Sequence, residues 1–188
     1  MRCHSCRGFS LSPICGSCRQ IYLNPVAKTR VLPSGLEVVS FFGYEDIEPF
    51  LLTKHYTRGW FIYRIVAKAA FRDLKECEED IAVIAIDDEP KGGYSHTALL
   101  AKELSRQGYR PIFGKLKAKK RVSYSGKPLS FRLKNPREFY YGGPRGIEAV
   151  LVDDIVTTGL TLQEAQQTLL KFDVEVKRAF VLADADRR

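Results

Sequence analysis

Two adjacent carboxylates follow an apolar run in the C-terminal half of the chain. Residues 149–152 are apolar, and Asp153 and Asp154 come directly after them. Ligands of an open parallel sheet bind beyond the carboxyl ends of its strands, so a strand that ends here would carry both side chains to the ligand edge. Neighbouring carboxylates can accept hydrogen bonds from two vicinal hydroxyl groups. The pair is therefore a candidate site for a sugar diol.

A loop rich in hydroxyl groups comes next in the sequence, and it contains Thr157, Thr158, Gly159 and Thr161. We expect a helix to begin near Thr161, and unpaired N–H groups and the helix dipole at such an end favour an anion. A diol acceptor beside a phosphate cradle matches a ribose 5-phosphate. An acidic strand end followed by an ordinary threonine cap would explain any one of these residues, but hardly the whole run.

Four of the five cysteines form two Cys-x-x-Cys pairs near the N-terminus, Cys3 with Cys6 and Cys15 with Cys18. Two such pairs can supply the four thiolates of a tetrahedral zinc site. Four thiolates leave no open coordination position, so zinc here would be structural. A redox pair and a chance cluster are the alternatives. The spacing predicts a small zinc knuckle.

The net charge of +8 is concentrated in two segments. Residues 115–137 contain nine basic side chains and no acidic one, and residues 1–30 contain five more, again without an acid. Basic side chains interleaved with aromatic ones suit single-stranded DNA, because the cations neutralise phosphates and the rings stack on bases. A solvated basic face is the ordinary alternative. The aromatic candidates are Tyr124, Phe131, Tyr140 and Tyr141, and the principal candidates for DNA binding are Lys115, Lys117, Lys119, Lys120, Arg121, Tyr124 and Lys127.

Strands and helices that alternate along the chain would position these residues. The run 81–86 is apolar throughout, which is typical of a strand buried on both faces. Alternating strands and helices indicate an α/β fold with a mostly parallel sheet flanked by helices. The expected elements are a β-hairpin over 29–42 with its turn at 33–35, helices near 45–55, 60–78, 94–107 and 161–172, and strands at 81–86, 110–116, 149–153 and 174–182.

Membrane crossing is not expected from the sequence. A membrane-spanning helix needs about 18 consecutive apolar residues, and no run of that length occurs. The segment after Met1 also lacks the apolar core of a secretory signal. We therefore expect a soluble, cytoplasmic protein without a transmembrane segment.

The run 149–161 resembles the phosphoribosyl-pyrophosphate motif of type I phosphoribosyltransferases. The motif consists of four apolar residues, two acids, two apolar residues, Thr-Thr-Gly, any residue and Thr, and every position matches. The resemblance implies a phosphoribosyltransferase-like fold. It also implies that Asp153 and Asp154 bind the ribose hydroxyl groups, and that residues 157–161 bind the 5-phosphate.

A second loop of that family holds the pyrophosphate together with Mg²⁺. The resemblance places this loop after the strand 81–86, at a segment that contains Asp87 and Asp88. Mg²⁺ would arrive with the ligand, because it prefers phosphate oxygens and water to a cage of protein ligands. The flexible loop that closes over pyrophosphate in the family corresponds to residues 115–137.

The zinc knuckle followed by this motif resembles the ComF/ComFC competence family. The segment 94–101 and the spacing of Leu129, Arg132, Asn135 and Phe139 resemble the family as well, whereas Ala85-Ile86-Asp87-Asp88 stands where the family usually has Pro-Val-Pro-Leu. The resemblance implies binding of single-stranded DNA during natural transformation, with DNA-uptake machinery at the inner face of the membrane as a further partner. It also implies a knuckle over 1–22 and a phosphoribosyltransferase-like domain over 23–188.

Two functions therefore compete. The first is a competence protein that binds single-stranded DNA and phosphoribosyl pyrophosphate with Mg²⁺, located in the cytoplasm and peripheral to the inner membrane. The second is a salvage phosphoribosyltransferase that transfers ribose 5-phosphate to a nucleobase. No general base stands out in the sequence, but such a reaction depends mainly on electrostatic stabilisation. The sequence does not identify an acceptor base, so whether the protein is an enzyme stays open at this point.

Overall fold

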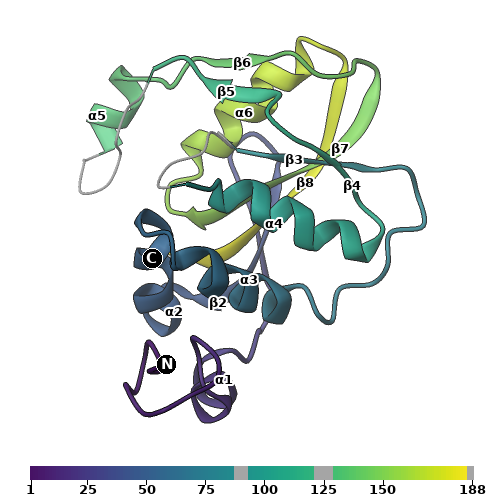
Figure 1. Cartoon of the computed structure of the whole chain (residues 1–188). Helices are drawn as coiled ribbons and strands as arrows, with labels where there is room; N and C mark the ends of the chain where they lie inside the picture. The colour runs from purple at the N-terminus through teal and green to yellow at the C-terminus, as the bar shows by residue number, and fades with distance from the viewer. Residues whose placement is uncertain (87–92, 121–128, 186–188) are drawn as a thin grey trace.

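The computed structural model describes residues 1–86, 93–120 and 129–185. In these ranges a six-stranded sheet has the strand order β1-β2-β8-β7-β3-β4 (Figure 1). Strand β1 runs antiparallel to β2, whereas all other neighbouring pairs are parallel. The strands of this sheet are β1 (Lys28–Val31), β2 (Glu37–Gly43), β3 (Ala82–Ala85), β4 (Arg110–Ile112), β7 (Ile147–Val156) and β8 (Val174–Asp184).

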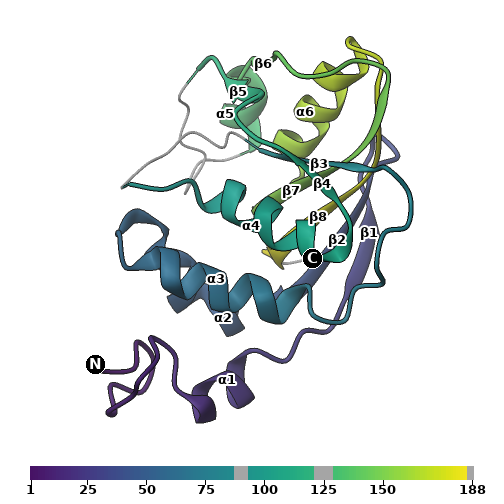
Figure 2. The same cartoon turned by 45° about the vertical axis from the view of Figure 1, so that its right-hand side comes forward.

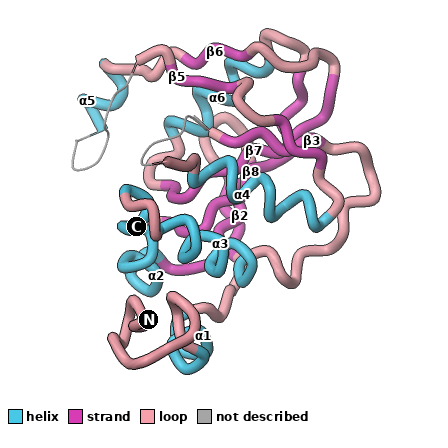
Figure 3. The backbone as a smooth tube through the Cα atoms, viewed as in Figure 1, coloured by secondary structure: helices cyan, strands magenta, loops and turns pink. Residues whose placement is uncertain are grey.

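Helices cover both faces of the sheet, as Figures 2 and 3 show. One face carries α2 (Tyr44–Leu51), a 3₁₀ helix (Leu52–His55), α3 (Gly59–Ala70) and α4 (His96–Leu104), and the other carries α6 (Leu160–Leu170). The central strands are apolar on both sides because each face packs into its own apolar cluster. This arrangement is the mostly parallel α/β sheet that the sequence predicted.

The predicted hairpin is present as the antiparallel pair of β1 and β2. Gly35 has a φ of +81° in the turn between them, a conformation that glycine adopts without steric cost. The predicted helix before Gly108 is present as α4 and a short 3₁₀ turn, Ser105–Gln107. The Ser95 hydroxyl caps the start of α4 by accepting from the backbone N–H of Ala98 at 3.0 Å.

Helix α3 ends at Ala70, so the expected continuation to Glu78 is wrong. Phe71 is buried and closes the apolar face of the helix. The next four residues carry charges of both signs, and Leu74 packs against the same apolar cluster from a non-helical turn. The chain instead runs through a non-helical connection, in which the backbone N–H of Cys77 donates to the carbonyl of Gln107 at 2.8 Å.

The expected strand 110–116 is two strands. Gly114 has a φ of +66°, which interrupts the extended backbone after β4. The next strand, β5 (Leu116–Ala118), leaves the main sheet and pairs antiparallel with β6 (Phe139–Tyr141). A short helix, α5 (Leu129–Lys134), lies between β5 and β6 in the chain. The basic segment therefore contributes β5, one strand of a small two-stranded ribbon beside α6 (Figure 1), and β6 follows the segment in the chain.

Strand β7 continues beyond its predicted end at Asp153. Ile155 and Val156 still pair with β8, opposite Ala183 and Asp184. The extension exists because β8 also runs further than the expected end at Leu182. The two carboxylates consequently lie inside a paired strand, and the connection to α6 is short.

The N-terminal segment contains a turn that is closed by an antiparallel bridge between Arg2 and Phe9, and one helix, α1 (Gly16–Tyr22), follows it. Ile14 and Leu23 are buried, and they belong to the same apolar cluster as α2 and α3. The segment thus packs against the body of the protein. Among the residues described, no helix combines the length and the apolar character needed to cross a bilayer.

Candidate functional site

The short connection between β7 and α6 forms a pocket. Its lining consists of Asp153 and residues 155–162, which include Thr157, Thr158, Gly159 and Thr161. The structure therefore brings these predicted site residues together at the N-terminus of α6. Hydroxyl groups, unpaired N–H groups and the dipole of an 11-residue helix all favour an anion at this place.

The N-terminal hairpin holds this loop in shape. The Arg30 guanidinium donates to the carbonyl oxygen of Thr157 and forms an ion pair with Asp184 at 2.7 Å. Gly159 has a φ of +77°, and a Cβ added there would lie 2.5 Å from Leu32 Cδ2. Glycine is thus required both by the backbone conformation and by the packing of Leu32.

The two carboxylates have different surroundings. Asp154 is only 5% exposed, and its Oδ2 lies 2.7 Å from Lys54 Nζ and 3.6 Å from His96 Nε2. The Tyr63 hydroxyl lies 3.1 Å from the same oxygen and 3.0 Å from the carbonyl oxygen of Leu51, so its single proton is shared between two acceptors. Asp153 instead lines the pocket, and its Oδ1 accepts from the backbone N–H of Asp154 at 2.8 Å. Lys54 and Tyr63 contact Asp154 directly, and a His96 ring nitrogen lies within 4.8 Å of both carboxylates.

These surroundings separate the pKa values of the two acids. Burial alone would raise the pKa of Asp154, but the Lys54 ammonium and His96 hold that pKa well below its usual range. Burial and the negative charge of Asp154 act together on its neighbour and raise the pKa of Asp153 to about 8. Burial lowers the pKa of Lys54, yet the charge and hydrogen bond of Asp154 raise it above its ordinary value. At neutral pH, Asp154 is therefore ionised and Asp153 is largely protonated.

Sequence reasoning did not identify Lys54, Tyr63 or His96 as site residues. Lys54 and Tyr63 are 100 and 91 positions away from Asp154 in the chain, so no local spacing connects them to it. Tyr63 lies on the apolar face of α3 and has the pattern of a core residue. The one available signal was its hydroxyl group, because a buried tyrosine usually needs a hydrogen-bond partner.

His96, Asp153 and Asp154 offer ligand atoms that all lie within 4.8 Å of one another. The Lys54 ammonium already neutralises the charge of Asp154, so the closeness of these three side chains does not require a metal ion. Asp87 and Asp88, which were predicted for the pyrophosphate and Mg²⁺, lie outside the described residues.

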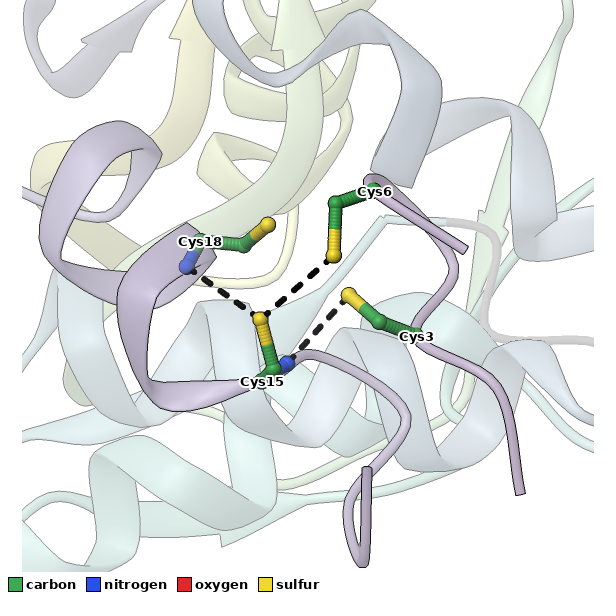
Figure 4. A group of neighbouring side chains, drawn as sticks. All are labelled: Cys3, Cys6, Cys15 and Cys18. Carbon is green, nitrogen blue, oxygen red and sulfur yellow. Dashed lines mark hydrogen bonds between the residues drawn. The ribbon is translucent and has the colours of Figure 1, made fainter. Parts of the chain in front are cut away.

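The four N-terminal cysteines turn their sulfur atoms toward one another, as Figure 4 shows. All four Sγ atoms lie within 4.8 Å of one another, and those of Cys6 and Cys15 are 3.7 Å apart. Zn–S bonds of about 2.3 Å give a tetrahedron with edges of about 3.8 Å. The backbone N–H of Cys15 also points at Cys3 Sγ, at 3.3 Å, which favours a thiolate. The donor set fits zinc, with these four residues as its ligands.

The cysteine cluster rests on α2. His4 Nε2 lies 3.1 Å from the carbonyl oxygen of Pro49, and its ring centroid is 6.2 Å from that of Phe50. The Tyr22 ring meets Phe50 edge-on at 6.0 Å. His4 is therefore a contact to the body of the protein and no member of the cluster. Helix α2 leads directly into the 3₁₀ helix that carries Lys54.

The ribbon of β5 and β6 presents lysines and one tyrosine to solvent. Lys115, Lys117 and Lys119 are exposed, and Lys117 lies directly opposite Tyr140, which is 55% exposed. Lys120 forms an ion pair with Glu138. Residues directly opposite in an antiparallel pair share one face, so a cation and an aromatic ring lie side by side.

The remaining residues that were predicted to bind DNA do not lie on this exposed face of the ribbon. Tyr141 is buried and its hydroxyl donates to the carbonyl of Pro144 at 2.9 Å, which excludes it from stacking on bases. Arg121, Tyr124 and Lys127 lie outside the described residues.

Comparison with protein families agrees with this geometry. The model of the phosphoribosyl transferase domain matches residues 56–188, which is more than half of the chain. The chain therefore belongs to the phosphoribosyl transferase domain family, and its fold is the type I phosphoribosyltransferase fold. The hairpin, Lys54 and the cysteine cluster all precede the matched range.

Solved phosphoribosyltransferases are similar to the chain over most of its length. An adenine phosphoribosyltransferase is 13% identical with a TM-score of 0.42, covering 90% of this chain and 89% of that chain. The orotate phosphoribosyltransferase from Aeropyrum pernix is 19% identical with a TM-score of 0.41, covering 89% and 80%. The adenine phosphoribosyltransferase from Saccharomyces cerevisiae is 13% identical with a TM-score of 0.42, covering 89% and 87%. No curated protein sequence matches the chain.

Proposed function

We propose that this protein is a competence protein of the ComF/ComFC family, which binds single-stranded DNA during natural transformation and carries a site for phosphoribosyl pyrophosphate with Mg²⁺. Residues 1–22 are its zinc knuckle, and residues 23–188 are its phosphoribosyltransferase-like domain. The protein acts in the cytoplasm beside DNA-uptake machinery at the inner face of the membrane.

The observation that carries the ligand assignment is the pocket between β7 and α6. The pocket contains the carboxylate of Asp153, which can accept hydrogen bonds from ribose hydroxyl groups. It also contains the hydroxyl and N–H groups at the N-terminus of α6. These groups suit the two ends of ribose 5-phosphate. Mg²⁺ would reach the site bound to the pyrophosphate oxygens.

The assignment of DNA depends on the ribbon of β5 and β6. Its exposed face pairs Lys117 with Tyr140, and two further exposed lysines flank the strand β5. Single strands bind where cations follow the phosphates and an exposed ring offers a stacking surface. The basic N-terminal segment lies at the other end of the molecule from this ribbon (Figures 1 and 2), so it would contact the DNA separately.

A salvage phosphoribosyltransferase is the second candidate, and membership of the family favours it. Such an enzyme needs an element that recognises the nucleobase. In this chain the segments before the matched range form the cysteine cluster, the hairpin and α2. We therefore expect no transfer to a free base.

Two assays on the wild-type protein separate the candidates. Calorimetry should show binding of phosphoribosyl pyrophosphate that requires Mg²⁺, because the cation neutralises the ligand's phosphates. Incubation with a panel of purine and pyrimidine bases should then release no pyrophosphate above the rate without protein. Release with one base would establish the salvage enzyme, and absence of any binding would refute the ligand assignment.

Affinity for single-stranded DNA should depend on salt through the lysines of the ribbon. Replacing Lys115, Lys117 and Lys119 with Gln should reduce the steepness of the plot of log affinity against log salt by about 2, at roughly 0.7 per lost phosphate contact. The matched control replaces three equally exposed lysines elsewhere, Lys75, Lys102 and Lys171. Fluorescence anisotropy with an oligonucleotide measures both variants. An equal loss in both would mean that the ribbon is not the DNA site.

Loss of base stacking at Tyr140 should affect DNA binding differently from loss of the lysines. Tyr140→Ala should weaken binding of single strands by about 1–3 kcal/mol, the range for one stacked base, and leave the salt dependence unchanged. Tyr56→Ala, which removes another exposed tyrosine, serves as the control. A change in salt dependence without a loss at low salt would contradict the stacking role.

A further inference from the structure

The exposed side of α3 carries only cations and one aromatic ring. Within the helix the exposed residues are Phe61, Arg64 and Lys68, and the exposed Arg58 and Arg72 stand just before its start and just after its end. Steps of three or four residues join all five, and residues at this spacing lie on one face of a helix. The five therefore form one line of side chains, which we call the α3 row.

No acidic residue interrupts the row. Residues 49–72 contain neither aspartate nor glutamate. The sequence shows no run of charge here, because the apolar residues that pack α3 on the sheet separate the cations. Arg64, Lys68 and Arg72 recur every four residues, which places them about 6 Å apart along the helix axis. Single charges at a regular separation of this size suit the phosphates of a stretched nucleic-acid strand.

Helix α4 adds a further cation beside the row. A groove between the ends of α3 and α4 is lined by Lys68, Phe71, Arg72, Glu103, Arg106 and Gln107. Glu103 is 5% exposed and lies between two guanidinium groups, 3.5 Å from that of Arg64 and 2.9 Å from that of Arg106. It holds both at the surface, because a buried carboxylate needs its charge partners. Glu103 and Asp73, which pairs with Arg72, offset two of the five cations, so this surface keeps a net charge of +3.

Aromatic rings lie at the N-terminal end of the row. Phe61 is 56% exposed and meets the Trp60 ring edge-on at 4.8 Å, and the Arg64 guanidinium lies over the Trp60 ring at 5.4 Å. The Arg58 guanidinium lies over Tyr56, which is 59% exposed, at 5.8 Å. Covering an exposed ring is favourable because its apolar area leaves water. Every nucleobase offers a flat face that can stack on such a ring.

We infer that the α3 row is a second contact surface for single-stranded DNA, separate from the ribbon of β5 and β6. The ribbon lies beside α6, whereas α3 and α4 cover the other face of the sheet (Figure 2). The inference rests on the proposed function, binding of single strands. The cations of the row contact successive phosphates, and Phe61 stacks on a base. A duplex fits this surface poorly, because its bases are already stacked on one another.

The charges are tested by replacing Arg58, Lys68 and Arg72 with Gln in one chain. Arg64 and Arg106 still pair with Glu103, so this variant should melt like the wild type. Fluorescence anisotropy with a single-stranded oligonucleotide should give a plot of log affinity against log salt that is less steep by about 2, at roughly 0.7 per lost phosphate contact. The matched control replaces three exposed cations on and beside β8, Lys171, Lys177 and Arg178, and should keep the wild-type slope.

The stacking contact is tested by Phe61→Ala. This variant should bind the single strand about tenfold more weakly than wild type, with an unchanged salt dependence, because a ring without charge is lost. Its affinity for a duplex of the same length should not change. Leu52→Ala, which shortens an apolar side chain that is 55% exposed, is the control and should bind like the wild type.

Vesicles of anionic phospholipid test the row against another negatively charged surface. The inference is overturned if the triple charge variant loses binding to vesicles and keeps wild-type affinity for the oligonucleotide. It is also overturned if only the ribbon variants lose affinity for DNA, an outcome that leaves the proposed function standing. Wild-type protein that binds no single strands even at low salt would instead refute the proposed function itself.

Discussion

Replacing Cys15 with Ser is expected to release a zinc ion and to unfold the N-terminal segment. The four sulfur atoms lie within 4.8 Å of one another, and few buried apolar side chains accompany them, among them Ile14 and Leu23. Structural zinc in small knuckles contributes about 10–16 kcal/mol of binding free energy, which is folding free energy for the segment. Elemental analysis should find one zinc per wild-type chain and less than a tenth of that in the variant.

Cys77→Ser is the matched control, because Cys77 lies outside the cluster and should leave the zinc content unchanged. Hydrogen exchange should show loss of protection over residues 1–26 in Cys15→Ser and after chelation of the wild type. The contacts of His4 and Tyr22 with α2 should be lost together with the metal, so the whole protein should also melt at a lower temperature. A metal-free protein with a protected N-terminal segment would contradict the zinc assignment.

Binding of phosphoribosyl pyrophosphate should strengthen as the pH rises toward about 8, and it should release a proton. Asp153 has its pKa raised to about 8 by burial and by the charge of Asp154, while Arg137 and Lys54 oppose the shift. Ribose hydroxyl groups donate hydrogen bonds, so they favour the ionised carboxylate and the ligand must expel the proton below this pKa. Affinity should therefore rise by at most about tenfold per pH unit below 8 and level off above it.

Calorimetry at pH 7.5 in two buffers with different ionisation enthalpies counts the released protons. Asp153→Asn should abolish the release and weaken binding by about 100-fold, since about 3 kcal/mol from two hydrogen bonds to a charged group is lost. Asp80→Asn removes an exposed acid that is paired with Arg110, and it should change neither quantity. Proton release that survives in Asp153→Asn would show that another group titrates.

The same carboxyl group should make stability depend on pH. Its pKa is higher in the folded chain than in the unfolded chain, so the native state binds more protons between about pH 4 and 8. Stability from this group is present below pH 4 and is lost as the pH rises toward 8. Denaturant unfolding of Asp153→Asn should lack this part of the pH dependence.

Local sequence signals determined much of the fold. The hairpin with Gly35, the helix that ends at Gly108 and the buried strands were all predicted, because glycine conformation, capping and apolar periodicity act over a few residues. The spacing of the cysteines likewise predicted that their sulfur atoms would meet. Local signals failed at α3, which ends at Ala70 instead of Glu78, and at Gly114, where one expected strand became two.

Only the tertiary structure determined which side chains surround each of the two adjacent acids. The sequence indicated that Asp153 and Asp154 would meet a ligand together at a strand end. Pairing with β8 extends the strand past both acids; Asp153 lines the pocket before α6, whereas Asp154 forms an ion pair with Lys54. Lys54 and Tyr63 reach Asp154 from about half the chain length away, because the packing of α3 on the sheet brings them there. The length of a paired strand and such distant contacts depend on the whole fold, and no short motif encodes them.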